Sequence, residues 1–263
     1  MSVDEPKVSV ITICRNAVGE IATTILSVIE QSYANLEYLI VDGASTDGTV
    51  EQIQIHGGDR VRWISERDEG IYDAMNKGVS LASGEWVIFM NAGDRFFSSD
   101  SLRQLLSTPL TDLDVVYGDH EVRYPRDFSR IQRARGIETL WKGMVCSHQA
   151  MVCRTQLLRE RPFGAGSLAE DFSFLMHLRA SNARFKHRPV IVASVATGGV
   201  SDTRRVEFVC DRLRIVSRYD RGIWVRAYYA WQIVLTSAKH LGRQCTPEPL
   251  RQWLLVRRWS ARR

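Results

Sequence analysis

The chain lacks the cysteine patterns that mark zinc sites and disulfide-stapled folds. Its cysteines are odd in number, widely spaced and without a Cys-x-x-Cys pair; they are Cys14, Cys146, Cys153, Cys210 and Cys245. Neither a zinc site nor a disulfide framework is therefore indicated. Reduced thiols, as in a cytosolic protein, are the simplest interpretation of these positions.

Signals for export and membrane insertion are also missing. The N-terminal segment MSVDEPKVSV has no basic stretch followed by an apolar one, so no signal peptide is expected. No apolar run reaches the roughly 20 residues that span a bilayer, since Arg226 and Gln232 interrupt the nearest candidate, residues 223–238. These absences predict a cytoplasmic chain.

Two common nucleotide-binding motifs are absent. A dinucleotide-dependent oxidoreductase carries Gly-x-Gly-x-x-Gly after its first strand, whereas residues 14–19 read CRNAVG. The Gly-Lys-Ser or Gly-Lys-Thr ending of a phosphate-binding P-loop does not occur either. Both enzyme classes are therefore disfavoured.

The positive charge of the chain is concentrated at its C-terminus. The 263 residues carry a net charge of +5, yet residues 203–263 hold 14 Lys and Arg against 4 Asp and Glu. Such a tail could bind nucleic acid or an anionic membrane surface. No nucleic-acid-recognition motif accompanies it, so no nucleic-acid partner is expected.

The first half of the chain alternates strand and helix patterns. Strands are predicted at residues 8–14, 37–41, 61–64 and 86–90, and helices at residues 21–30, 49–55 and 71–81. Such alternation predicts a parallel sheet with helices on both faces. The second half is less regular: strands are predicted at 115–117, 150–153 and 190–195, a helix at 170–179, and helices from Asp202 onward with breaks at Gly222, Pro247 and Pro249.

Polar side chains gather where the early predicted strands end. They are Arg15, Asn16, Asp42, Glu66, Asp68, Asn91 and Asp94. Any one of them alone is explained by helix capping or a turn. In an open parallel sheet, however, ligands bind in the crevice outside the carboxyl ends of the strands, so the whole set predicts a ligand site.

Several stretches resemble the family 2 glycosyltransferases: VSVITICRNAVGEI, TILSVIEQSYANLEYLIVDGASTDGT and SERDEGIYDAMNKGVSLASGEWVIFMNAGD. Later segments, SHQAMVCR, LAEDFSFLMHL and ATGGVSD, fit the bacterial exopolysaccharide branch that includes the colanic acid transferases. The resemblance implies an α/β domain of the GT-A (Rossmann-like) type over residues 1–202, with a mostly parallel sheet flanked by helices. Its donor half would cover about 1–118 and its acceptor half about 119–202, and a basic amphipathic helical extension would follow over 203–263.

The resemblance implies a nucleotide-sugar donor held by the N-terminal half. Thr12 and Asn16 would lie beside the nucleotide, and Asp42 would accept hydrogen bonds from the base, since a carboxylate suits the N–H groups of uracil or guanine. Asp68 and Asn76 would line the donor pocket, although Asn76 is equally suited to capping or bridging helices. UDP is the expected nucleotide, with GDP second.

The metal motif of such enzymes, Asp-x-Asp or a relative, is reduced here to Asn91-Ala92-Gly93-Asp94. Mn²⁺ and Mg²⁺ need few protein oxygens when a diphosphate supplies others. The resemblance therefore implies Asp94 as the metal ligand, with Asn91 on the ribose or on a metal-bound water. The missing carboxylate supports an alternative, a nucleotide-sugar-binding regulator with impaired catalysis.

The reaction also needs a base, because a sugar hydroxyl must lose its proton as it attacks the anomeric carbon. Glu170-Asp171 fits the family's base position, which implies Asp171 as the catalytic base and Glu170 as its neighbour. Taken alone, both carboxylates are explained by the dipole of the helix they begin. The implied reaction is one inverting displacement onto a glycan or lipid-linked acceptor in bacterial surface polysaccharide synthesis.

Two further motifs have open roles. His148-Gln149 matches the family pattern, but a buried structural histidine would fit it as well. Gly198-Gly199-Val200-Ser201 suits a flexible loop near the diphosphate or acceptor and equally a tight turn.

The C-terminal tail combines aromatic and cationic residues. The stretch IWVRAYYAWQIVLTSAKHL begins at Ile223, and Trp253, Arg257, Arg258 and Trp259 follow it. This mixture suits the headgroup region of a membrane, which predicts peripheral contact with the inner face of the cell membrane. Docking of the same helices on the catalytic domain, or pairing of two subunits, explains the residues equally well.

Overall fold

The computed structural model describes residues 5–125, 128–199 and 204–245. The chain forms two compact units, Met1–Gly199 and Val200–Arg263. Several predictions fall outside the described residues: the helix start at Asp202, the Val200-Ser201 end of the glycine loop, the breaks at Pro247 and Pro249, and the aromatic and basic residues from Trp253 to Trp259.

The first half of the larger unit contains the predicted parallel sheet. Its strands are β1 (Val8–Cys14), β2 (Leu36–Asp42), β3 (Arg62–Ser65) and β4 (Trp86–Phe89), in the order β3-β2-β1-β4. Its helices are α1 (Ile21–Ile29), α2 (Thr49–Gly57) and α3 (Ile71–Leu81). All neighbouring pairs among these four strands are parallel, so their carboxyl ends meet at one edge, where Cys14, Asp42 and Ser65 lie in register.

The second half extends the same sheet with mixed pairings. It adds β5 (Arg95–Phe96), α4 (Ser101–Leu105), β6 (Val115–Tyr124), β7 (Phe128–Gln132), β8 (Met151–Arg154), α5 (Thr155–Glu160), α6 (Glu170–Ala180) and β9 (Phe185–Ala196), together with the short 3₁₀ turns η1 (Gly58–Arg60), η2 (Ile137–Lys142) and η3 (His148–Ala150). The sheet continues as β4-β8-β6-β9-β5, with β7 beside β6. Strands β6 and β9 are parallel, and the other pairings added here are antiparallel.

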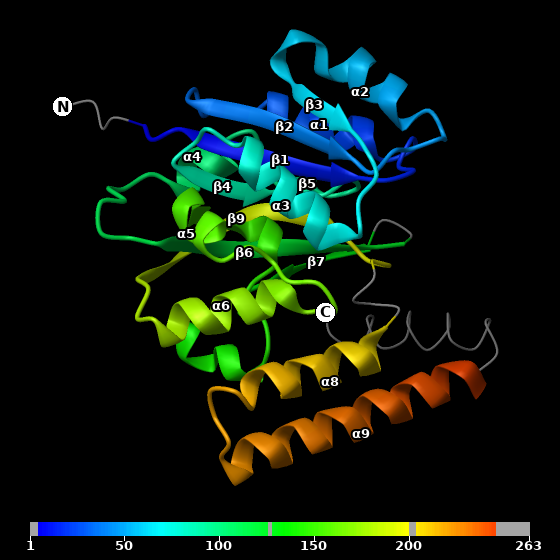
Figure 1. Ribbon diagram of the computed structural model, residues 1–263, viewed down its shortest axis with the longest axis vertical. Coiled ribbons are helices and arrows are strands. Elements are labelled where there is room, and N and C mark those ends of the chain that lie inside the picture. The colour runs from blue at the N-terminus through cyan, green and yellow to red at the C-terminus, as the bar shows by residue number, and fades with distance from the viewer. Residues whose placement is uncertain (1–4, 126–127, 200–203, 246–263) are drawn as a thin grey trace. The chain divides into compact units, whose positions relative to one another are not determined.

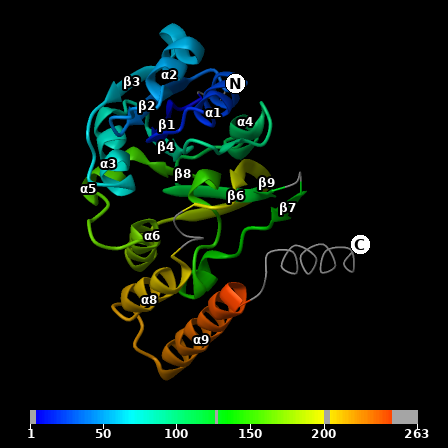
Figure 2. The same ribbon diagram turned by 90° about the vertical axis from the view of Figure 1, so that its right-hand side faces the viewer.

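Helices cover both faces of the sheet, as the alternating pattern predicts. Figures 1 and 2 show α3 and α5 on one face and α1 and α4 on the other. Helix α3 lies very close to β1, because a Cβ added at Gly78 would be 2.4 Å from Cγ2 of Ile11. Only a glycine permits that approach, and it holds the first turns of α3, with Tyr72 and Asn76, near the carboxyl ends of the strands.

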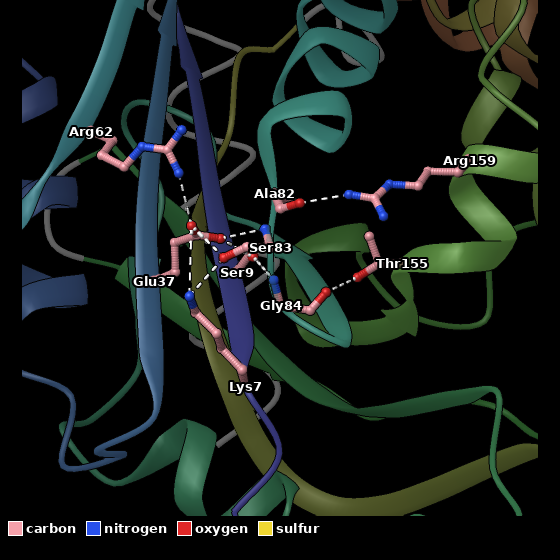
Figure 3. A network of polar contacts seen from close by, with 9 residues as sticks. All are labelled: Lys7, Ser9, Glu37, Arg62, Ala82, Ser83, Gly84, Thr155 and Arg159. Atoms are coloured by element: carbon pink, nitrogen blue, oxygen red, sulfur yellow. Dashed lines mark hydrogen bonds and ion pairs between the residues drawn. The ribbon is translucent and has the colours of Figure 1, made fainter.

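At the opposite ends of the strands, a buried carboxylate ties the sheet together (Figure 3). Glu37 accepts hydrogen bonds from the Ser9 hydroxyl at 2.5 Å and from the Ser83 backbone N–H at 2.7 Å. Arg62 of β3 lies 3.0 Å from the same carboxylate. Burial raises the pKa of Glu37, but the bonds from Ser83 and Ser9 outweigh it and lower the pKa below its ordinary value. The carboxylate therefore stays charged and fixes β1, β2, β3 and the turn before β4.

The smaller unit contains two helices that lie side by side and run in opposite directions (Figure 1). They are α8 (Arg205–Val216) and α9 (Ile223–Cys245). In the turn between them, the Asp220 carboxylate accepts the Gly222 N–H at 2.8 Å. Among the helices of the described part of the chain, none is both long and apolar enough to cross a membrane.

Candidate active site

The Asp42 carboxylate organises the ends of three strands. It is fully buried and accepts the Ser65 hydroxyl of β3 at 2.6 Å and the Ser45 backbone N–H at 2.9 Å. The Cys14 thiol at the end of β1 lies 3.5 Å from its other oxygen. Burial raises the pKa of Cys14, and the neighbouring Asp42 charge raises it further, so the thiol stays neutral and able to donate. Asp42 therefore links the carboxyl ends of β1, β2 and β3.

Asn16 joins the loop after β1 to the loop after β2. Its backbone N–H donates to the Ser45 hydroxyl at 2.8 Å, and its side-chain oxygen accepts the Thr46 N–H at 3.0 Å. The residue adopts a left-handed conformation with φ of 49°, which asparagine tolerates better than most residues. Asn16 is exposed, so it is accessible at this edge of the sheet.

Gly43 allows the Asp68 carboxylate, which follows β3, to approach the ends of β1 and β2. A Cβ at Gly43 would lie 2.2 Å from the Asp68 carboxylate and 3.3 Å from Cδ of Arg15. Asp68 is held there by the Gly70 N–H, which donates to it at 3.0 Å. The structure thus brings Asn16, Asp42 and Asp68 together from three separate strand ends, as the pattern predicts.

The side chains of Thr12 and Asn76 are used within the protein. The fully buried Thr12 hydroxyl donates to the Met90 carbonyl at 2.7 Å and lies 2.9 Å from the Tyr38 hydroxyl. The Asn76 side chain bonds both the carbonyl and the N–H of Phe163, at 2.8 and 2.9 Å. Thr12 thus links β1 to β2 and to the residue after β4, and Asn76 links α3 to the segment between α5 and α6. That either residue lines the donor site stays a prediction.

The turn that follows β4 is held rigidly from several directions. Asp94 is 7% exposed, and its carboxylate accepts the Ala196 N–H of β9 at 2.9 Å and contacts the Gln149 amide. Burial raises the pKa of Asp94, while the Ala196 bond and nearby cationic groups partly offset the rise. The Thr24 hydroxyl of α1 donates to the Asp94 carbonyl at 2.7 Å, so the turn cannot shift without disturbing the core.

Unpaired polar atoms surround this turn. Oδ1 of Asn91, Nδ1 of His120 and Nε of Arg123 are buried and have no hydrogen-bond partner among the described residues. Another nitrogen of Arg123 contacts the Gly93 carbonyl, and β6, which carries His120, runs beside η3. Burial lowers the pKa of His120 to about 4, against the opposing Asp119 charge, so its ring is neutral at pH 7. Buried polar groups without partners are rare and call for a ligand, ion or water.

His148 connects this turn to the predicted base. Its Nε2 lies 3.0 Å from the Asn91 amide nitrogen, and its Nδ1 lies 3.6 Å from Oδ2 of Asp171. The adjacent Gln149 contacts Asp94. The His148-Gln149 pair, whose role the sequence left open, therefore joins the donor-side turn to α6.

Asp171 occupies the first turn of α6 and is firmly oriented. Its Oδ1 accepts the Phe172 N–H at 2.8 Å and lies 3.2 Å from the Tyr72 hydroxyl of α3. Burial raises the pKa of Tyr72, and the Asp171 charge raises it further, so the phenol remains a donor. The neighbouring Glu170 instead accepts the Gly164 N–H at 3.2 Å. Of the two carboxylates, Asp171 is the one in contact with His148.

The residues of the turn fit a divalent cation only in part. Within the described ranges, no group of three or more His, Cys, Asp and Glu is placed to hold a metal ion. Asp94 offers a carboxylate, and the unpaired Asn91 oxygen next to it can accept a hydrogen bond from a hydroxyl or a metal-bound water. Mg²⁺ binds through one or two carboxylates when substrate phosphates supply further oxygens, so the turn suits a metal that arrives with a diphosphate.

A cavity also lies away from these residues. It measures about 720 Å³, and its lining includes Pro6 before β1, Tyr33 before β2, Trp86 at the start of β4 and Arg154 at the end of β8. None of the predicted site residues lines it. The cavity therefore does not belong to the strand-end site.

Most of the chain matches one known protein family. Residues 9–176, more than half of the chain, match the family described as Glycosyl transferase family 2. The chain belongs to this family. This family 2 protein is therefore a sugar-transferring enzyme by family, as the resemblance implied, and the match spans the predicted residues from Thr12 to Asp171.

Relatives in sequence are also glycosyltransferases. One is the PGL/p-HBAD biosynthesis glycosyltransferase of Mycobacterium bovis, which is 28% identical over 89% of this chain and 94% of the relative. Another is the Escherichia coli UDP-Glc:alpha-D-GlcNAc-diphosphoundecaprenol beta-1,3-glucosyltransferase WfgD, 28% identical over 45% of this chain and 47% of WfgD.

Solved structures confirm the GT-A fold. The mannosyltransferase PcManGT from Pyrobaculum calidifontis, in complex with GDP-Man and Mn2+, matches with a TM-score of 0.67 and 19% identity, over 98% of this chain and 81% of that one. S. aureus TarS 1–349 in complex with UDP-GlcNAc matches with a TM-score of 0.65 and 18% identity, over 80% and 65%.

Proposed function

We propose that this enzyme is an inverting glycosyltransferase that moves a sugar from a nucleoside-diphosphate sugar to a glycan or lipid-linked acceptor in bacterial surface polysaccharide synthesis. The observation that carries the proposal is the continuous contact from Asn91 through His148 to Asp171. This contact joins the turn after β4, which suits a diphosphate, to the buried Asp171 carboxylate on helix α6. A two-substrate transfer needs these two functions side by side.

The donor is proposed to bind over the carboxyl ends of the parallel strands. Asp42 fixes these strand ends from within, Asn16 and Asp68 contact the nucleotide, and Asn91 accepts a hydrogen bond from the ribose or from a metal-bound water. Thr12 and Asn76 position these groups from beneath. UDP is the favoured nucleotide, supported by the UDP-Glc in the name of WfgD, and GDP, bound in PcManGT, is second.

Asp94 is the proposed protein ligand of Mn²⁺ or Mg²⁺. The bound metal would neutralise the diphosphate as it leaves. On the other side of the sugar, Asp171 accepts the proton of the acceptor hydroxyl. That oxygen forms the new bond to the anomeric carbon while the bond to the diphosphate oxygen breaks, and the leaving group keeps the electron pair. Attack opposite the leaving group inverts the anomeric configuration.

Donor binding is tested by thermal unfolding against a panel of nucleotide sugars with and without Mn²⁺. At about 100 times its Kd, a ligand adds about 2.7 kcal/mol to the free energy of unfolding, which raises Tm by roughly 5–10 °C for a domain of this size. We expect the largest rise from a UDP-sugar with Mn²⁺. If a GDP-sugar raises Tm more than a UDP-sugar does, only the assignment of the donor nucleotide changes. If no nucleotide sugar raises Tm, the proposed function is contradicted.

A catalytically impaired, nucleotide-sugar-binding regulator is the alternative function, and the single carboxylate of the Asn91–Asp94 turn is the observation in its favour. Measuring the release of nucleoside diphosphate from the identified donor distinguishes the glycosyltransferase from the regulator. The enzyme hydrolyses the donor slowly or transfers its sugar, whereas the regulator binds the donor without consuming it.

Peripheral binding to the cytoplasmic face of the membrane is proposed for the smaller unit. Trp224, Trp231 and Val234 of α9 are 81, 59 and 60% exposed, and their spacing of seven and three residues places them on one face of the helix. Aromatic side chains on one face, within a basic segment, suit a headgroup region.

We expect anionic liposomes to sediment the protein at low salt, and Trp224→Ser with Trp231→Ser to weaken binding at least tenfold, since burying one large apolar side chain is worth about 1.5–3 kcal/mol. Deleting residues 222–263 should have a larger effect, and neutral liposomes serve as the control. Intact protein that ignores anionic liposomes would point to docking on the domain or to subunit pairing.

A further inference from the structure

His148 lies between the two halves of the proposed site and carries no assigned role. Its side chain is 19% exposed and that of Asp171 is 11% exposed, so both are largely removed from water. Strand β6 carries the neutral His120 beside the same segment η3. A histidine in this position either titrates, acts as a base itself, or orients its neighbours.

The contact with Asn91 determines which ring nitrogen of His148 carries the proton. The Asn91 amide nitrogen is a donor, and it lies 3.0 Å from Nε2 of His148. With the amide in this orientation, Nε2 accepts, so it has no proton and its lone pair is engaged. A neutral ring then carries its proton on Nδ1, the nitrogen that faces Oδ2 of Asp171. This arrangement leaves the ring without a free lone pair, which argues against His148 as the base.

The same geometry shows how Asp171 is held. Its Oδ1 is engaged by the Phe172 N–H and the Tyr72 hydroxyl, and its Oδ2 faces the His148 Nδ1–H at 3.6 Å. That distance is longer than a hydrogen bond, but contacts of catalytic groups often tighten only when substrate is bound. With the His148 contact tightened in this way, donors on both oxygens would fix the plane of the carboxylate.

We propose that His148 is a positioning residue, held by Asn91 as the Nδ1–H tautomer, which orients Oδ2 of Asp171 to accept the proton of the acceptor hydroxyl. This inference rests on the proposed function, because it presumes Asp171 as the base. It also connects the two substrates, since Asn91, which fixes the imidazole, lies on the donor-side turn.

The tautomer can be measured without any activity assay, by ¹⁵N NMR of protein labelled at histidine. We expect His148, assigned by comparison with His148→Ala, to carry its proton on Nδ1. Asn91→Asp replaces a donor by an acceptor at the same place, so the spectrum should change to protonation at Nε2 or at both nitrogens. Protonation of Nε2 in the wild-type protein would overturn the inference, whatever reaction the enzyme catalyses.

A pair of substitutions tests the orienting role kinetically. Asparagine places an N–H where Nδ1 stands, and glutamine places one nearer to Nε2, so His148→Asn should keep more of kcat than His148→Gln. His148→Ala should lower kcat by roughly 10- to 100-fold, since misplacement by about 1 Å costs on that order, with both KM values within about twofold of wild type. His177→Ala, on the helix α6 that carries Asp171, is the control and should leave the rate unchanged.

The outcomes separate this inference from the proposed function. If the wild-type enzyme transfers sugar and Asp171→Asn does not, but His148→Ala keeps normal kcat, the positioning role is wrong and the proposed function stands. A loss in His148→Ala that appears only in the donor KM would likewise assign His148 to donor binding. If the wild-type protein transfers no sugar, the proposed function fails, and the NMR tautomer still decides whether Asn91 fixes His148.

Discussion

Asp171→Asn is expected to lower kcat by about 10²–10⁴-fold, the usual contribution of general-base catalysis. Asparagine preserves the shape of the side chain and can still accept the Phe172 N–H and the Tyr72 hydroxyl through its oxygen, so the fold around α6 should remain intact. It cannot take a proton at pH 7. Because the base acts on the acceptor hydroxyl in the transition state, donor affinity should change little.

Glu170→Gln is the matched control for this substitution. Glu170 is the adjacent carboxylate on the same helix, but it bonds to the Gly164 N–H and not to His148. The Glu170→Gln enzyme should transfer sugar at a rate within a few-fold of wild type. If Glu170→Gln abolishes turnover and Asp171→Asn does not, the base is one residue earlier than proposed. Near-normal transfer by Asp171→Asn would refute the base assignment.

Asp94→Ala is expected to abolish detectable transfer and to remove any tightening of donor binding by Mn²⁺. Asp94 is the only protein carboxylate proposed to bind the metal. Removing this carboxylate removes the charge that holds the metal against the diphosphate. The same carboxylate also accepts the Ala196 N–H and contacts Gln149. Alanine therefore removes a structural anchor as well.

Asp94→Asn separates these two effects. The amide keeps the size of the side chain and an oxygen for the Ala196 N–H, but it lacks the negative charge that attracts a cation. We expect its Tm without ligand to fall less than that of Asp94→Ala, while the response to Mn²⁺ is lost in both. Donor binding that still tightens with Mn²⁺ in Asp94→Asn would assign the metal to other ligands.

The sequence predicted the parallel part of the sheet well, because β1, β2 and β4 are buried apolar runs that helical patterns separate. Strand β6 was predicted to end at Tyr117, yet it continues to Tyr124. Gly118 and the polar residues after it conceal the extension: a Cβ at Gly118 would lie 2.5 Å from the Val190 carbonyl, so only glycine fits beside β9. Strand β5 has two residues and β7 is largely exposed, so neither carries a clear hydrophobic pattern.

The sequence predicted which residues belong to the candidate site better than it predicted the contacts between them. Strand ends brought Asn16, Asp42 and Asp68 together because parallel strands share one edge, which a sequence pattern can reveal. The contacts of His148 with Asn91 and of Tyr72 with Asp171 join residues 57 and 99 positions apart. Tertiary packing of α3, η3 and α6 creates them, and no local pattern encodes it.

Four side chains near the site went unassigned for the same reason; they are Tyr72, His120, Arg123 and Gln149. Tyr72 and Gln149 lie within motifs that resemble the family, in GIYDAMNKG and SHQAMVCR, so their positions carried a signal. His120 and Arg123 lie on the part of β6 that was not predicted. Their unpaired atoms become visible only when burial is known.

Calorimetric titration of the donor into the wild-type enzyme, Asp171→Asn and Asp94→Asn, each with and without Mn²⁺, tests most directly whether one site combines a donor side and a base. The account predicts that Mn²⁺ tightens binding equally in wild type and Asp171→Asn, although only the wild type then turns over with acceptor, and that Asp94→Asn shows no effect of Mn²⁺. Loss of donor binding in Asp171→Asn, or a response to Mn²⁺ in Asp94→Asn equal to that of wild type, would contradict it.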